Sequence, residues 1–245
     1  MGIQVPASFV ESLSKLSLGV YGWGDELLLG ALMTVSLATA SVGIGLLVGG
    51  KLAFLKIQPN QVLRGLAHGL TLLFRGTPEF LVILVVFFGL DIFINAVMRA
   101  MTVDLTVSTP KFWAGALGLG LIFGVYASEV FKGAYFAVAD GLIEASRSLG
   151  LSHIQTLRQV HIPLLWRYAL PGLMNLWLVL LKDTSLVAVI AFDELLRTAK
   201  VAGETEREPF IFFLAAGALY LAMTSVSDRA KERLEGRVAL VGRNQ

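Results

Sequence analysis

Five segments of this chain are long and apolar enough to cross a lipid bilayer, and they constrain its fold more than any other feature. They lie near residues 26–49, 78–98, 112–132, 169–192 and 209–227. An α-helix needs about 17–25 residues to cross roughly 30 Å of hydrocarbon. Backbone polar groups in lipid must be satisfied within the chain, so such segments are expected to be helical. The sequence therefore predicts an all-α polytopic membrane protein, with one transmembrane domain over residues 1–245 and about five spans.

The composition supports a bilayer environment and excludes several kinds of site. Only 16% of the residues are charged, against about a quarter in soluble domains. The chain has no cysteine, which excludes disulfides and thiolate metal sites, and its scattered histidines do not suggest a metal site. A phosphate-binding loop with Gly-Lys-Ser/Thr does not occur in the sequence. We therefore expect no catalytic residue and no cofactor in this chain.

The distribution of basic residues predicts the orientation. With five spans, placing the N-terminus outside puts most lysines and arginines in the inner segments. The inner set is Lys51, Lys56, Arg64, Arg75, Lys132, Arg147, Arg158, Arg167, Arg229, Lys231, Arg233, Arg237 and Arg243. The outer set is Lys15, Arg99, Lys111, Arg197, Lys200 and Arg207. Cytoplasmic loops carry the excess of basic residues, so the C-terminus and the segment between the third and fourth spans are predicted to be cytoplasmic.

That polar segment, residues 140–168, is predicted to contain two short helices. Asp140 is expected to cap a helix over 140–149, and Gly150 to end it in the left-handed conformation. Ser152 is expected to cap a second helix, which Pro163 would terminate. The small residues Ala145 and Ser146 predict a shallow surface for a partner's side chains. By periodicity alone, an ordinary helix–turn–helix loop remains the alternative.

The spacing within this segment resembles a known motif. Glu144, Ala145 and Ser146 are followed, after three intervening residues, by Gly150 and, after nine more intervening residues, by Val-His-Ile-Pro at 160–163. This pattern resembles the coupling motif of permease subunits of ATP-binding-cassette (ABC) importers, whose short helix docks on a cytoplasmic ATPase. The resemblance implies a coupling role for Glu144, Ala145, Ser146, Arg147, Gly150 and Pro163. Ser146 stands where alanine is usual in that family.

Other motifs extend the resemblance to the permeases for uptake of polar amino acids, the histidine, glutamine, arginine and opine type. They are Leu-Phe-Arg-Gly-Thr-Pro at 73–78, Tyr-Ala-Ser-Glu-Val-Phe-Lys-Gly at 126–133, Leu-Lys-Asp-Thr-Ser-Leu at 181–186 and Glu-Leu-Leu at 194–196. They occur in the family's order with consistent gaps, over residues from about 26 to 225.

The first of these motifs predicts a broken helix beside a substrate path. Arg75, Gly76, Thr77 and Pro78 lie where a polar segment meets an apolar one, and glycine and proline there favour a new helix start. Backbone groups freed by the break could meet a polar solute. The alternative for Arg75 is a side chain that extends to the lipid headgroups.

A second group of polar residues lies inside the fourth apolar segment. A charged side chain at the bilayer centre costs about 2.5–3.5 kcal/mol, so Lys182 and Asp183 are not expected to face lipid. Asn175 precedes Lys182 by seven residues and shares nearly the same helix face, and Thr184 and Ser185 add hydroxyls. These residues are predicted to line the substrate path, and an internal ion pair that only fixes helix packing is the alternative.

One departure bears on the cargo. Many members of the family carry an acidic residue where this chain has Leu176. Either the cargo is not recognised here through a cationic side chain, or an unlike partner permease supplies that contact. Basic amino acids, glutamine or glutamate, and opine-like conjugates are all compatible with the resemblance.

The resemblance implies a permease subunit of an importer in the bacterial inner membrane, not an enzyme. Its expected partners are a second permease subunit, homologous but unlike, two ATPase subunits that hold ATP and magnesium, an extracytoplasmic solute-binding protein and membrane lipid. Nucleic acid is not expected among them. Two alternatives are an ion-gradient-driven secondary transporter, which usually shows internal repeats, and a non-transporting membrane anchor or channel.

Overall fold

The computed structural model describes residues 14–19, 22–101 and 108–240, and the regular structure of these residues is entirely helical. The elements are α2 (Gly24–Lys56), α3 (Gln61–Gly76), α4 (Glu79–Ala100), α5 (Lys111–Ala137), α6 (Asp140–Ser148), α7 (His153–Thr156), the π-helical η1 (Leu157–His161), α8 (Ile162–Asp183), the 3-10 helix η2 (Thr184–Ile190), α9 (Leu195–Glu206) and α10 (Pro209–Leu240). The predicted all-α fold is confirmed.

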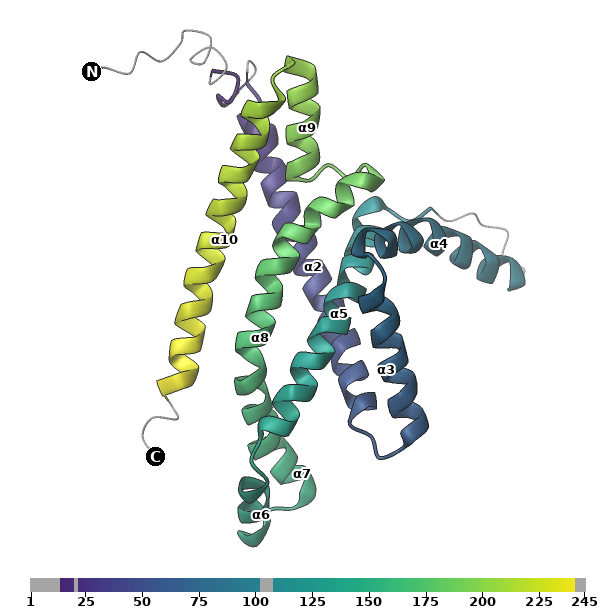
Figure 1. Cartoon of the computed structure of the whole chain (residues 1–245), viewed down its shortest axis with the longest axis vertical. Coiled ribbons are helices and arrows are strands. Elements are labelled where there is room, and N and C mark those ends of the chain that lie inside the picture. The colour runs from purple at the N-terminus through teal and green to yellow at the C-terminus, as the bar shows by residue number, and fades with distance from the viewer. Residues whose placement is uncertain (1–13, 20–21, 102–107, 241–245) are drawn as a thin grey trace.

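Five stretches of the described residues are long and apolar enough to cross a membrane. They are Gly24–Lys56, Glu79–Ala100, Lys111–Ala137, His153–Ile190 and Pro209–Gly236. The five predicted windows fall on these helices, which extend beyond the windows at most of their ends. Figure 1 shows α2, α5, α8 and α10 running along the bundle, whereas α4 leaves it to the side.

The helix α3 is an addition to the predicted pattern. It folds back beside the lower half of α2 in Figure 1, and Asn60 caps it by accepting hydrogen bonds from the amides of Val62 and Leu63. It ends at Gly76, and Thr77 is extended with φ −98° and ψ 136°. Proline disfavours helical conformation in the residue before it, so Pro78 explains why the chain breaks here. The predicted helix break is confirmed, and α4 begins at Glu79.

The helices α2 and α5 form the most closely packed pair of the bundle, because glycines let their backbones approach. A Cβ atom at Gly49 would lie 2.7 Å from the carbonyl oxygen of Gly124, a distance that side chains do not tolerate. Leu37, Ile83 and Leu119 are fully buried in the core built around this pair. This packing gives the neighbouring helices α4 and α8 a fixed wall to lie against.

Glu194 organises the end of the bundle opposite the coupling segment. Its carboxylate caps α9 by accepting hydrogen bonds from the amides of Leu196 and Arg197, both at 2.8 Å, and another from the Tyr220 hydroxyl of α10 at 3.0 Å. The amide of Leu195 donates to Thr34 of α2 at 3.2 Å. The Glu-Leu-Leu motif at 194–196 therefore joins three helices at this end.

Candidate functional site

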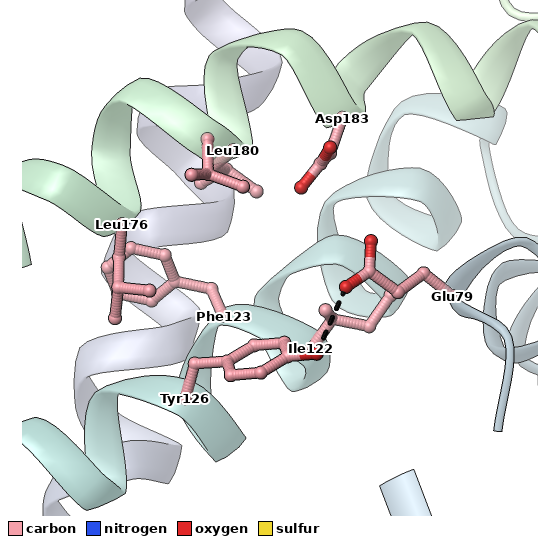
Figure 2. A pocket seen from close by; sticks show the side chains of 8 residues that line it. Glu79, Ile122, Phe123, Tyr126, Leu176, Leu180 and Asp183 are labelled. Carbon is pink, nitrogen blue, oxygen red and sulfur yellow. Dashed lines mark hydrogen bonds between the residues drawn. The ribbon is translucent and has the colours of Figure 1, made fainter. Parts of the chain in front are cut away.

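A cavity of about 250 Å³ lies between α4, α5 and α8. Most of its lining is apolar, but it holds two carboxylates. Figure 2 shows Asp183 reaching from α8 toward Glu79 of α4, with the Tyr126 ring of α5 beside them. The lining consists of Glu79, Ile122, Phe123, Tyr126, Leu176, Val179, Leu180 and Asp183.

Both carboxylates stand at helix ends, and this explains their position. Glu79 is the first residue of α4, directly after the break at Thr77 and Pro78. Asp183 is the last residue of α8, where the α-helix passes into the 3-10 helix η2. Leu176, Leu180 and Asp183 are spaced by four and three residues, which puts them on one helix face. Two irregular points in the helices therefore supply the polar groups of the pocket.

Tyr126 connects the pocket to a basic residue. Its hydroxyl donates a hydrogen bond to Glu79 Oε1 at 3.3 Å, and the Arg75 guanidinium carbon lies 5.9 Å from its ring centroid. That distance is within the range of a cation–π contact. Arg75 itself is exposed on the isolated chain. Arg75 therefore contacts the pocket wall at the Tyr126 ring. Its guanidinium forms no ion pair with Glu79 or Asp183.

The pocket therefore suits a ligand that carries positive charge. In the part of the chain that the structure describes, neither Glu79 nor Asp183 takes part in an ion pair. Two like charges beside one apolar cavity repel each other, and an opposite charge between them favours both ionised forms. Hydrogen bonds with charged partners are also stronger than neutral ones. An ammonium or guanidinium group would satisfy both acids.

The structure brings only some of the predicted path residues to this cavity. Asp183 lines it, and Arg75 contacts Tyr126 in its wall. Asn175 and Lys182 are exposed on the outside of the isolated chain, and Thr184 is fully buried with its hydroxyl bonded to the carbonyl of Leu181 at 2.8 Å. The partly exposed Ser185 bonds to the carbonyl of Lys182.

Glu79 and Tyr126 were not predicted as path residues, although signals for both exist. Glu79 is an acidic residue that directly follows the predicted break, at the start of an apolar segment. Tyr126 opens one of the motifs quoted above. Leu176, the position where many permeases carry an acid, lies in the pocket wall. An internal Lys182–Asp183 ion pair does not occur among the described residues, so that alternative is wrong.

A second polar cluster lies between α2 and α5. Lys56 is 1% exposed, and its ammonium donates to Ser128 Oγ at 2.6 Å and to Glu129 Oε1 at 2.7 Å. The Glu129 side chain remains 36% exposed. This cluster was not predicted, because Lys56 was counted only among the inner basic residues and Glu129 only as part of the motif at 126–133. It joins the last residue of α2 to α5 one helical turn beyond Tyr126.

The segment with the coupling motif forms a compact pair of helices. Gly150 has φ +84°, so the predicted left-handed turn is confirmed. Ser152 caps α7 in a capping box with Gln155, as predicted. The residue before α6 that occupies the cap position is Ala139, without a side-chain bond, so the predicted cap by Asp140 is wrong. Asp140 instead lies in the first helical turn, where negative charge favours the helix dipole.

Two further expectations about this segment are wrong. Pro163 does not terminate a helix, because α7 passes through the wide π-helical turn η1 into α8, near whose start the proline sits. A wide turn moves the preceding carbonyls away from the proline ring, which removes the usual clash. Ser146 is only 4% exposed, so its side chain does not contribute to a partner-facing surface. Glu144, Ala145 and Arg147 are exposed.

Comparison with known proteins identifies the family. Residues 28–240 match the family described as "Binding-protein-dependent transport system inner membrane component". The histidine/lysine/arginine/ornithine transport system permease protein HisQ of Salmonella typhimurium is 38% identical over 90% of this chain and 96% of its own length. The chain belongs to this family. The permease is therefore a multi-pass inner-membrane transport component, and the resemblance noted above is confirmed.

Other similar proteins agree with this assignment. The nopaline transport system permease protein NocQ of Agrobacterium fabrum is 39% identical to the permease over 89% of this chain and 92% of its own length. A crystal structure of an amino acid ABC transporter with histidines contains a chain that matches with a TM-score of 0.76 and 27% identity, covering 95% of the permease and 100% of that chain. A chain of the MetNI methionine ABC transporter has the same fold, with a TM-score of 0.66 and 17% identity.

Proposed function

We propose that the permease is the membrane-spanning subunit of an ATP-driven ABC importer, and that it passes an amino acid or conjugate with a cationic group into the cytoplasm. The observation that carries this proposal is the pocket in which Glu79 and Asp183 face one cavity and form no ion pair with any residue that the structure describes. The cargoes named for the relatives, which include lysine, arginine, octopine and nopaline, support the same class. Leu176 stands where many members of the family carry an acidic residue. Glu79 and Asp183 place two other acidic residues in the same pocket wall.

The remaining parts of the importer are proposed from family membership and from the coupling segment. A second, unlike permease subunit completes the transmembrane pair, and two cytoplasmic ATPases that hold ATP and magnesium bind the coupling segments. An extracytoplasmic solute-binding protein delivers the cargo. The permease itself catalyses no reaction and holds no cofactor. Its N-terminus lies outside and its C-terminus in the cytoplasm, as the distribution of basic residues favours.

Uptake by the reconstituted importer tests the cargo class. Liposomes containing both permeases and the ATPases, supplied with the solute-binding protein, should accumulate labelled L-arginine only with ATP inside. Glu79→Gln should reduce this uptake at least tenfold, on the scale of one charge-assisted hydrogen bond. Glu26→Gln, which neutralises an exposed acid at the far end of α2, is the matched control. Uptake that persists without ATP but follows an ion gradient would contradict the proposal.

Docking of the ATPase is tested at the left-handed turn. A β-branched residue is strained at positive φ, so Gly150→Val should disrupt the coupling segment and prevent copurification of the ATPase while membrane insertion is retained. Gly236→Val is the control, because a Cβ there meets no atom within 4 Å and the backbone is helical. Normal copurification with Gly150→Val would contradict the assigned coupling role.

A further inference from the structure

The coupling segment is joined differently to the two spans that flank it. On one side, α5 ends at Ala137, and the next two residues are extended, Val138 with ψ 118° and Ala139 with ψ 129°. On the other side, α7 passes through η1 into α8 with helical backbone conformation at each junction, although Pro163 near the start of α8 donates no backbone hydrogen bond. The amide of Leu157 bonds to His153 and Ile154, and that of Ile162 bonds to Leu157. Helical continuity therefore exists only toward α8.

A buried contact holds α6 against the helical run formed by α7, η1 and α8, called the rod below. The hydroxyls of Ser146 and Thr156 are hydrogen-bonded at 3.1 Å, and the two residues are 4% and 3% exposed. Ser146 Oγ also bonds to the carbonyl of Ile143 at 2.7 Å. The turn between the helices is closed by the amide of Leu151, which donates to the carbonyl of Ser146 at 3.2 Å. A buried hydroxyl that loses its partner is costly, so this contact resists separation of α6 from α7.

The rod also reaches the pocket. The helical run that begins at α7 contains Pro171 within α8, and beyond it carries Leu176, Leu180 and Asp183 on the pocket face. Movement of α6 would consequently be transmitted to the pocket wall if α6 and α8 are held as one unit. The exposed side chains of the segment, Leu149 at 83% and Ile154 at 67%, remain free to contact another protein.

We propose that Ser146 and Thr156 are positioning residues whose hydrogen bond makes α6 and the α7–η1–α8 rod a single lever. This inference rests on the proposed ATPase docking, since the ATPase is what would move α6. Ser146, which the sequence assigned to the partner surface, then acts behind that surface by holding α6 in place. The extended residues Val138 and Ala139 connect this lever to α5, and the Tyr135–His161 and Phe131–Trp166 ring contacts also join α5 to it.

Spin labels on the assembled importer test the lever directly. One label replaces Gly141 of α6, where a side chain meets open space, and the other replaces the exposed Tyr168 of α8. In the otherwise unmodified complex we expect one narrow distance distribution, the same without nucleotide and when trapped with ATP and vanadate. Thr156→Val, which keeps the shape but removes the hydroxyl, should broaden the distribution and lower the ratio of the arrangement with α6 packed on α7 to the separated arrangement about fivefold.

Two further variants keep the result interpretable. Ser146→Ala removes the other hydroxyl with a good helix former and should broaden the distribution in the same way. Ser148→Ala is the matched control, because its hydroxyl is exposed and bonds to the carbonyl of Glu144 within its own helix α6. A Thr156→Val distribution identical to the unmodified one, or a distance that changes with nucleotide in the unmodified complex, would overturn the inference.

Failure of the proposed function gives a different result. If the ATPase does not copurify with the unmodified permease, the docking assignment is contradicted and the lever with it. If the ATPase copurifies but the Thr156→Val distance distribution is unchanged, only the proposed role of the Ser146–Thr156 hydrogen bond is contradicted. The expected outcome is copurification with all three variants together with loss of the single distance in Thr156→Val and Ser146→Ala.

Discussion

Two charged clusters in the same helical bundle differ in how their charges are satisfied. Lys56 is buried and bonded to Glu129 at 2.7 Å, with Ser128 as a second acceptor. Glu79 and Asp183 line a cavity and take part in no ion pair among residues 14–19, 22–101 and 108–240. A closed pair holds helices together, whereas unpaired acids beside a cavity destabilise the empty protein and favour a cationic ligand. The first cluster is therefore expected to control stability, and the second to control uptake.

The strongest test of this contrast is Glu129→Gln. It leaves the buried ammonium of Lys56 without its counter-charge, and removal of one partner of a buried pair costs about 3–5 kcal/mol. We expect a corresponding loss in the free energy of unfolding, measured by denaturant titration of the purified permease in detergent micelles. A loss below about 1 kcal/mol, on the scale of an exposed ion pair, would show that the cluster does not hold α2 and α5 together.

Asp183→Asn should show the opposite pattern. It removes one charge-assisted hydrogen bond to a cationic cargo, worth about 1.5–3 kcal/mol, so the apparent affinity for L-arginine should fall roughly 10- to 150-fold. The free energy of unfolding should stay constant or rise, because repulsion between the two acids is relieved. The measurement combines uptake at varied L-arginine concentration with the same denaturant titration. Unchanged affinity with lowered stability would reverse the roles of the two clusters.

Lys56→Met should have a smaller effect on stability than Glu129→Gln. The Glu129 side chain is 36% exposed, so water can solvate its carboxylate after the ammonium is removed, and methionine fills the apolar space. We expect a loss of about 1–2 kcal/mol, below the cost of stranding a fully buried charge. Lys51→Met on the exposed side of α2 is the control. Equal losses for Lys56→Met and Glu129→Gln would contradict this asymmetry.

Tyr126→Phe is expected to give the smallest change. It removes the 3.3 Å hydrogen bond to Glu79 and keeps the ring beneath Arg75. A single hydrogen bond contributes about 1 kcal/mol, which corresponds to an approximately fivefold weaker apparent affinity for L-arginine. Uptake kinetics measure this directly. A loss as large as that of Asp183→Asn would mean that the Tyr126 hydroxyl itself contacts the cargo.

Local chemistry was enough to predict much of the architecture. Long apolar runs can satisfy their backbone only as helices in lipid, so the five candidate spans follow from composition and length. Pro78 restricts Thr77 whatever surrounds it, Gly150 accepts the left-handed turn, and Ser152 caps the helix that follows it. These effects act over a few residues and do not depend on the rest of the fold. The spacing of the coupling motif is likewise a local property.

Sequence alone thus determined that this chain is a membrane permease with a helix break before the second span and a two-helix segment between the third and fourth spans. The tertiary structure decided which residues face which surroundings. Asp183 lines the pocket while its neighbour Lys182 does not, Leu176 lines it while Asn175 does not, and Ser146 faces Thr156. Lys56 and Glu129 are 73 residues apart in the chain. Packing between distant helices fixes the rotation of each one about its axis, and the chain's local pattern carries no record of that rotation.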